Sequence, residues 1–495
     1  MSSGHICIHG HWYQPPRENP FTGVVDDQPS AAPYANWNER ITAECYEPNS
    51  EAKILAEDGS VRRTLNNYCY VSSDWGPTLL DWLDDHHPDL YQRIIDADLA
   101  SRERFGGHGT AMAQAYNHTI LPLSNRRDKR TQILWGIADF ESRFGRSPEG
   151  MWLPETAVDL ESLELMADAG VGFTVLSPYQ AAWVLDGSEW IDVVGGSIDT
   201  RVPYTVQLFG GRSISVFFYD GPLSQEIAFN GVLDDGAILA KRLVQGLGEP
   251  SADTRLVNVA TDGETYGHHH RFGEMALARA IEEIESDPDI TLTTYAQFLA
   301  SSPPTRIVRI IEATSWSCAH GVDRWRSDCG CDTGRHPEWN QEWRSHLREA
   351  MDLLRDAVAE EFDVRGGTLL IDPWLARDEY VEVLLGGSTE RFLDRHMAPG
   401  AGESRPTALA LLEAQRHAML MYTSCGWFFD DLAGLEGVFV LRHAGKLIQL
   451  TRDVSGLDLE APFLEVLERA ESNRGGTGRD VYETEVAPFI RAEAV

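Results

Sequence analysis

Lysine is nearly absent from this chain of 495 residues, in which only Lys53, Lys129, Lys241 and Lys446 occur. Arginine supplies almost all the positive charge, and the formal net charge is -35 at pH 7. Because phosphate backbones bind through lysine and arginine, this charge excludes nucleic acid and anionic membranes as expected partners. Such a surface is typical of a salt-rich cytoplasm, and equally of an acidic proteome encoded by a GC-rich genome.

The sequence also has no long hydrophobic run, since no stretch approaches the roughly 18 apolar residues that cross a bilayer. Its first residues, MSSGHICIHGHW, contain neither the basic nor the apolar segment of an export signal. Seven cysteines are an odd number, so we expect reduced thiols rather than a disulfide framework. These absences predict a cytoplasmic globular protein.

The first 300 residues alternate short apolar runs with amphipathic helical patterns. The strand-like runs are 5–12, 68–73, 150–154, 172–178, 214–220 and 255–264, and the helical patterns are 78–100, 129–144 and 273–286. Alternation of this kind predicts an α/β fold in which crossover helices connect the strands of a parallel sheet. Polar residues repeatedly follow the apolar runs, at the strand ends where the active sites of barrels lie.

The pattern changes after the linker-like segment 301–305, beyond which strand signals are sparse. Charged amphipathic patterns at 343–362, 407–422 and 460–471 predict helices there. We therefore expect a catalytic domain at 1–302 and a mostly helical domain at 303–495.

Two histidines end the first predicted strand, in His9-Gly10-His11. Residues two apart on a strand point to the same face, so both side chains can line one pocket. They are candidate metal ligands or hydrogen-bond donors to sugar hydroxyls, and the alternative is a pair of buried structural histidines. His118, which follows Asn117 before an apolar segment, is a weaker candidate for a pocket wall.

Carboxylates end two further predicted strands. Glu155 follows Trp152 and Pro154, and Asp262 and Glu264 follow the run at 255–264. Trp152 would offer a flat face to a sugar ring, with Glu155 aimed at it. Two carboxylates at the ends of different strands suit glycoside chemistry, in which one attacks the anomeric carbon and the other protonates the leaving oxygen. The three histidines 268–270 point in different directions and are not expected to chelate one ion.

Taken in order, these segments resemble glycoside hydrolase family 57. The motifs are HGHWYQPP (9–16), YNHTILPL (116–123), EGMWLPE (149–155), DGETYGH (262–268) and SWSCAHGVDRW (315–325). The chain departs from the family pattern in the insertion of Trp12-Tyr13 after His11. Within the family, the chain is most similar to an uncharacterised subgroup with a helical C-terminal extension.

The resemblance implies an incomplete, TIM-like (β/α)7 barrel, retention of configuration and an α-glucan substrate. It matches Glu155 to the nucleophile and Asp262 to the acid/base. The substrate-binding positions that it implies are His9, His11, His118, Trp152, His268, Trp316 and Trp325. The last two would be brought to the active site by the C-terminal domain, and catalysis would need no cofactor.

Cysteine and histidine cluster near the fifth motif, as Cys318, His320, Cys329 and Cys331. Thiolate and imidazole at such separations are ligands for zinc or an iron–sulfur cluster, although the spacing is not that of common zinc folds. Reduced thiols packed near the motif are the alternative. A metal here would be structural rather than catalytic.

The leading hypothesis is an α-glucan hydrolase, 4-α-glucanotransferase or branching enzyme, acting through a covalent glycosyl-enzyme intermediate. The second is a metal-dependent polysaccharide deacetylase or α-mannosidase that uses His9, His11 and an aspartate as ligands and loses activity to chelators. The third is a glycan-binding protein without turnover, which the two carboxylates disfavour.

Overall fold

The computed structural model describes residues 4–249 and 254–493, which form two compact units. The first unit takes its residues from Met1–Gln14, Asp27–Gln114 and Phe140–Glu312, and the second from Pro15–Asp26, Ala115–Asp139 and Ala313–Val495. Two short segments from the N-terminal half thus belong to the second unit. A hydrophobicity pattern indicates which residues are buried but not which unit they pack in, so it did not indicate that these two segments belong to the second unit.

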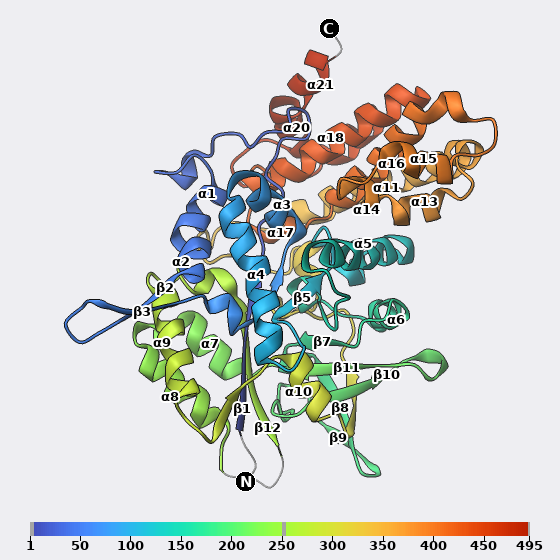
Figure 1. The fold of residues 1–495 in the computed structure, drawn as a ribbon. Coiled ribbons are helices and arrows are strands. Elements are labelled where there is room, and N and C mark those ends of the chain that lie inside the picture. The colour runs from blue at the N-terminus through green and yellow to red at the C-terminus, as the bar shows by residue number, and fades with distance from the viewer. Residues whose placement is uncertain (1–3, 250–253, 494–495) are drawn as a thin grey trace. The chain divides into compact units, whose positions relative to one another are not determined.

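Seven parallel strands form the centre of the first unit. In spatial order they are β12 (Arg255–Asp262), β1 (Gly4–Trp12), β4 (Ser72–Trp75), β5 (Ala111–Gln114), β6 (Met151–Trp152), β7 (Phe173–Leu176) and β11 (Ser213–Phe218). A single parallel bridge, between Gly150 and Phe173, joins β6 to β7. The incomplete (β/α)7 barrel expected from the sequence is confirmed. Figure 1 shows β1 beside β12.

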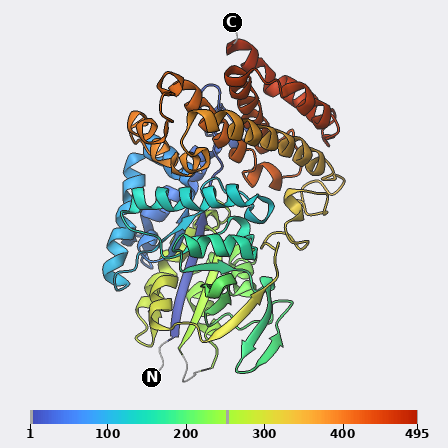
Figure 2. The ribbon, with the colours of Figure 1, turned by 90° about the vertical axis from the view of Figure 1, so that its right-hand side faces the viewer.

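Additional strands extend this framework, and the sequence pattern did not predict them. A mixed sheet continues from β11 through β10 (Tyr204–Gln207), β14 (Arg306–Ile310), β8 (Ala181–Asp186) and β9 (Glu189–Asp192). Strand β13 (Ile290–Leu292) pairs with β1, and β2 (Ala52–Leu55) forms a hairpin with β3 (Val61–Leu65). Figure 2 shows β14, in yellow, beside the green strands of the mixed sheet. These strands are short and partly exposed, so their hydrophobic signal is weak.

Helices of the first unit follow the strands as the alternation predicted. They are α1 (Trp37–Ile41), α2 (Glu47–Ser50), α3 (Pro77–His86), α4 (Pro88–Arg104), α6 (Leu160–Asp168), α7 (Gly221–Phe229), α8 (Gly236–Gly246), α9 (Gly273–Glu285) and α10 (Tyr295–Ser301). The single helix predicted at 78–100 is two helices, which meet at His87. Pro88 causes the break, because proline has no N–H to continue a helix but suits the first position of a new one.

The second unit is helical in its C-terminal part. Its helices are α11 (Trp343–Glu361), α12 (Gly367–Leu369), α13 (Pro373–Glu379), α14 (Val381–Leu384), α15 (Thr389–His396), α16 (Arg405–Leu420), α17 (Cys425–Phe428), α18 (Leu435–Ser455), α19 (Glu460–Leu467), α20 (Gly478–Glu485) and α21 (Ala487–Glu493), and α5 (Arg126–Phe144) begins in this unit. Trp343, Leu347, Met351 and Leu354 lie on one buried face of α11, at the three- and four-residue spacing of an amphipathic helix. Across the described residues, no helix is both long and apolar enough to span a bilayer.

Candidate active site

The register of three parallel strands places Asp74, His11 and Asp262 in one row. His11 on β1 is paired with Asp74 on β4 and with Asp262 on β12. Neighbouring strands lie about 4.8 Å apart and paired side chains leave the sheet on the same face. The row therefore brings one histidine between two carboxylates at the C-terminal edge of the sheet, where barrel enzymes hold their active sites.

Asp74 bridges the two histidines of β1. His9 Nε2 lies 2.9 Å from one carboxylate oxygen of Asp74, and His11 Nδ1 lies 2.8 Å from the other. The second ring nitrogen of His9, Nδ1, lies 3.0 Å from Ser72 Oγ. All of these side chains are buried. The sequence analysis missed Asp74 because the predicted strand ended at residue 73, one residue before it.

Charges within this group are strongly coupled. Although burial opposes it, the ion pair with Asp74 raises the pKa of His11 to about 9. Burial lowers the pKa of His9 despite its hydrogen bond to the same carboxylate. Burial alone would raise the pKa of Asp74, but His11 and His9 hold it below its usual value. At neutral pH the group is thus an imidazolium of His11, an ionised Asp74 and a neutral His9.

Trp152 lies against the two histidines. Its ring stacks on His9 with centroids 4.8 Å apart, and on His11 with centroids 5.3 Å apart. The side chain is fully buried. Trp152 lies within β6, where its ring packs on the two histidines near the end of β1. Its contact with a sugar ring stays a prediction.

Glu155 occupies a strained backbone position directly after β6. It lies in the short 3-10 helix Pro154–Thr156 with φ 58° and ψ 21°, and Thr156 also has a positive φ, of 51°. Residues with a Cβ rarely adopt this region, and each such position costs about 1–3 kcal/mol. Gln180 holds the turn, since its side chain donates to Thr156 O and accepts from Thr156 Oγ1. Strain that is retained in this way marks a carboxylate whose position matters.

Asp262 ends β12, and Gly263 begins a tight turn after it. A Cβ at Gly263 would lie 2.2 Å from the ring of Trp12, so the buried indole requires glycine here. Although Asp262 retains access to solvent, reduced hydration among its protein neighbours and the negative charge of Asp74 raise its pKa. The nearby cation of His11 opposes this rise. A raised pKa suits Asp262 to carry a proton.

Glu264 is a second, buried carboxyl group beside Asp262. The hydroxyl group of Tyr46 donates a hydrogen bond to its Oε1. Burial, followed by the negative charge of Asp262, raises the pKa of Glu264 to about 7, while Tyr46 and His11 oppose this. The sequence placed Glu264 near Asp262 but gave it no role. Tyr46 lies in an irregular helical segment more than two hundred residues away in the sequence, and no motif indicated it.

Replacement of Glu264 by glutamine tests this coupling. The change keeps an oxygen that accepts from Tyr46 but removes the carboxyl group whose pKa is about 7, so no second negative charge appears beside Asp262 as the pH rises past this value. We expect the kcat/KM–pH profile to lose the inflection near pH 7 that this ionisation causes in wild type. Glu274→Gln, which changes another buried glutamate of the same unit, should leave the profile unchanged. Loss of activity at every pH would instead make Glu264 the essential acid.

The remaining predicted site residues, His118, His268, Trp316 and Trp325, form none of the hydrogen bonds described above for Asp74, His9 and His11. His268 Nδ1 lies 2.5 Å from Glu44 Oε2, while His270 Nε2 lies 2.7 Å from the carbonyl oxygen of Ala228, so these two histidines of the run at 268–270 face different partners. Residue His118 belongs to the second unit, has a φ of 54° and contacts Ser424 Oγ. In the same unit Trp325 is fully buried and Trp316 is half-buried. The substrate-binding roles of Trp316 and Trp325 stay predictions.

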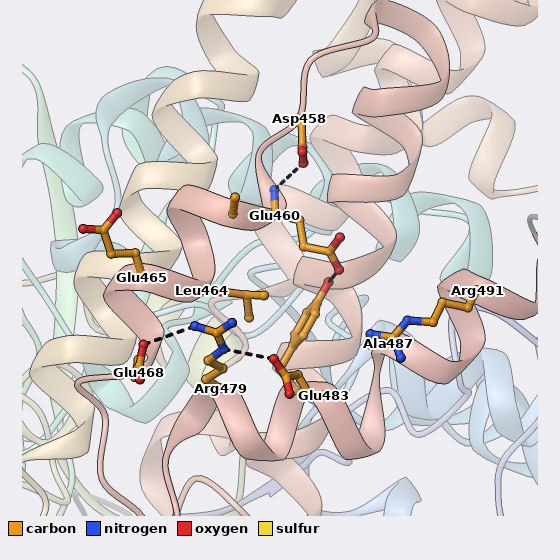
Figure 3. Close-up of a pocket in the computed structure, with 11 residues that line it drawn as sticks. Asp458, Glu460, Leu464, Glu465, Glu468, Arg479, Glu483, Ala487 and Arg491 are labelled. Carbon is orange, nitrogen blue, oxygen red and sulfur yellow. Dashed lines mark hydrogen bonds and ion pairs between the residues drawn. The ribbon is translucent and has the colours of Figure 1, made fainter.

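A cavity of about 390 Å³ in the second unit is an alternative place for a functional site. It lies among α19, α20 and α21, and several of its charged groups are hydrogen-bonded to other residues of the cavity (Figure 3). Arg479 binds Glu468 and Glu483, and the hydroxyl group of Tyr482 donates to Glu460. Glu460, Glu468 and Glu483 are thus already paired, and none of the described residues that line this cavity has a positive φ. The chemistry of the first unit is the better candidate.

Comparison with known proteins finds a family model that covers strands β4, β6 and β12 of this candidate site. The family model described as glycosyl hydrolase family 57 matches residues 39–311, more than half of the chain. The chain belongs to glycosyl hydrolase family 57. A second model, described as a domain of unknown function (DUF3536), matches residues 339–494. The family 57 match includes Glu155, Asp74 and Asp262, and the second match covers most of the helical part.

Individual relatives of this family 57 chain are distant. A 4-alpha-glucanotransferase from Thermococcus litoralis is 23% identical over 254 residues, which make up 49% of this chain but only 35% of that relative. Among solved structures, an exo-type maltose-forming amylase from Pyrococcus sp. ST04 aligns with a TM-score of 0.69 and 16% identity, covering 97% of this chain and 88% of that one. A branching enzyme from Pyrococcus horikoshii aligns with a TM-score of 0.56 and 16% identity, covering 99% and 97%.

Proposed function

We propose that this family 57 chain is a retaining glycosidase or transglycosylase that acts on α-glucans, with Glu155 as nucleophile and Asp262 as acid/base. The observation that supports the proposal is that a strained carboxylate follows β6 and a carboxyl group of raised pKa ends β12, each at the C-terminal end of a strand of the same parallel sheet. The substrate class rests on the relatives, whose names describe enzymes of α-glucan metabolism.

The reaction would proceed in two displacements. Asp262 donates its proton to the glycosidic oxygen while a carboxylate oxygen of Glu155 bonds to the anomeric carbon, so the leaving chain departs as an alcohol. Asp262, now ionised, then removes a proton from water or from a sugar hydroxyl, whose oxygen attacks the same carbon and releases Glu155. Water gives hydrolysis and a sugar hydroxyl gives transfer. The two outcomes share the intermediate and differ in how well water is excluded.

Asp74 and the histidines would serve this chemistry through their charge and position. The imidazolium of His11 lies in the same row as Asp262, and its positive charge limits the rise of the pKa of Asp262. Gln114, at the end of β5, is buried, and its amide atoms have no hydrogen-bond partner among the described residues. Buried amides need partners, which makes Gln114 a further candidate for contact with a sugar hydroxyl. The predicted substrate contacts, on the ground of the motif order, stay those of the sequence analysis: His9, His11, His118, Trp152, His268, Trp316 and Trp325.

The geometry disfavours the two alternative functions. A metal-dependent deacetylase or mannosidase would need free ring nitrogens, but both nitrogens of His9 face Ser72 and Asp74, and Nδ1 of His11 faces Asp74. Among the described residues, His9, His11 and an aspartate do not form a group whose ligand atoms converge closely enough to hold one ion. A glycan-binding protein without turnover would have no need for the strained position of Glu155.

Asp262→Asn tests the acid/base role. On maltooligosaccharides, whose leaving group needs a proton, we expect a loss of kcat/KM of about 10²–10⁴-fold. Aryl α-glucosides with an acidic phenol leave without this help, so the first step on them should be much less affected. Chromatography of the products from wild type would separate shorter chains, the result of hydrolysis, from rearranged ones, the result of transfer.

The matched control is Asp192→Asn, which changes an exposed aspartate on β9 of the same unit and should retain wild-type rates. Equal losses of Asp262→Asn on both substrate types would show that Asp262 does not act as the acid. Inactivity of wild type towards every α-glucan would contradict the substrate class.

A further inference from the structure

Three cysteines and one histidine of the second unit converge on one point. Their ligand atoms, from Cys318, His320, Cys329 and Cys331, all lie within 4.8 Å of one another. In the part of the chain that the structure describes, this is the one group of three or more histidine, cysteine or acidic residues with such convergence. The cluster is separate in sequence from both proposed catalytic carboxylates, so it does not depend on the proposed function.

The spacing of these atoms matches a tetrahedral metal site. Cys318 Sγ lies 3.9 Å from Cys329 Sγ and 3.8 Å from Cys331 Sγ, and Cys331 Sγ lies 3.6 Å from His320 Nδ1. With Zn–S of about 2.3 Å and Zn–N of about 2.05 Å, a tetrahedron requires S···S of about 3.8 Å and S···N of about 3.6 Å. A disulfide would need sulfurs about 2.05 Å apart. An iron–sulfur cluster would spread its thiolates around several iron atoms rather than one.

Backbone geometry brings the ligands together. Gly330, between Cys329 and Cys331, has a φ of 77°, and this left-handed position turns the chain so that two near-adjacent cysteines face one point. Gly321, directly after His320, has a φ of 85°, and a Cβ there would lie 2.4 Å from the carbonyl oxygen of Ala313. Between Ala313 and Glu342, the only regular element is one 3-10 turn, Asp323–Trp325. The segment thus has little secondary structure of its own to fix it.

Two buried arginines surround the cluster. Arg344 donates to the carbonyl oxygen of Cys331 and to those of Phe428 and Phe429. Arg324 donates to the carbonyl oxygens of Ser317, Asp332 and Phe428. Among the described residues neither forms an ion pair with a carboxylate, although the charge of Asp430 is near enough to act on Arg344. Buried cations are costly without a counter-charge. Zn²⁺ with three thiolates and a neutral imidazole carries one net negative charge, which would supply it.

We propose that Cys318, His320, Cys329 and Cys331 bind one structural zinc ion. The ion cross-links the loop that carries Trp316 and Trp325, and so fixes a conformation that this loop has little secondary structure to hold. All four positions of the tetrahedron are filled by protein atoms, so the site is closed and has no open position for substrate or water. Its role is therefore to hold the fold of this segment.

Metal analysis of the full-length protein tests the site directly. Protein expressed with zinc and freed of loosely bound ions should contain about one zinc per chain by mass spectrometry. Cobalt(II) exchanged into wild type should show thiolate-to-metal charge transfer and intense visible bands, which are typical of tetrahedral sulfur coordination. This measurement needs no variant and so does not depend on whether a variant folds.

Cys329→Ser combined with Cys331→Ser should lose the zinc and lower the melting temperature. Cys69→Ser, which changes a half-buried cysteine of the first unit, should keep one zinc. Stoichiometric iron in place of zinc, three freely titrating thiols without metal, or a disulfide within the cluster would each overturn the proposal. Activity is not the readout, so failure here would leave the catalytic proposal untouched.

Discussion

Glu155→Gly is expected to lose turnover of α-glucans by about 10⁴-fold or more, because it removes the nucleophile of the first displacement. Glycine is the informative replacement at this position. Glu155 has a φ of 58°, which glycine adopts without strain, so the variant should fold with a melting temperature no lower than that of wild type. Loss of activity without loss of stability would assign Glu155 to chemistry rather than to the fold.

Azide makes the test of Glu155→Gly specific for a nucleophile. The small anion fits the space left by the carboxylate and attacks an activated aryl α-glucoside from the face that Glu155 would use. We expect restored phenol release and a glycosyl azide with inverted configuration, which proton NMR identifies. Glu189→Gly, at an exposed position on β9, serves as the control and should stay fully active. A variant that retains its rate without azide would contradict the assignment.

Asp74→Asn is expected to have the second-largest effect, on both stability and activity. The change leaves the buried His11 without its counter-charge, and removing one partner of a buried ion pair typically costs about 3–5 kcal/mol. It should also lower the pKa of His11, so that the imidazole becomes neutral near neutral pH. Chemical denaturation and the rate on maltooligosaccharides measure the two effects. Asp192→Asn, on the surface, provides the comparison.

The pH dependence separates the role of this charge from simple packing. The folded-state pKa of His11, about 9, lies above the unfolded value of about 6.5. The stabilisation is therefore fully present below pH 6.5 and is lost as the pH rises towards 9. The melting temperature of wild type should fall across this window, while that of Asp74→Asn should change much less. His11→Gln should behave like Asp74→Asn, and parallel curves for all three proteins would refute the ion pair as the cause.

Much of the barrel was predictable because its strands and helices carry strong local signals. The run at 5–12 is buried along β1, and the pattern at 273–286 became α9 almost residue for residue. The strand β5 was missed, since its residues AMAQ include no β-branched or aromatic residue. Pro88 was a sequence signal for the helix break at His87. The sequence analysis overlooked this signal because the apolar periodicity continues on both sides of the proline.

By itself the sequence determined the order of the motifs, the family and the residue types that carry the chemistry, since these depend on the identity and spacing of neighbours along the chain. Tertiary structure alone decided that Asp74 bridges His9 and His11, that Tyr46 reaches Glu264, and that Trp152 is buried beneath the histidines. It also brought Cys318 to Cys329 and Cys331 with tetrahedral spacing. Register between strands and the path of irregular loops set these contacts, and both arise from packing between segments that are distant in the sequence.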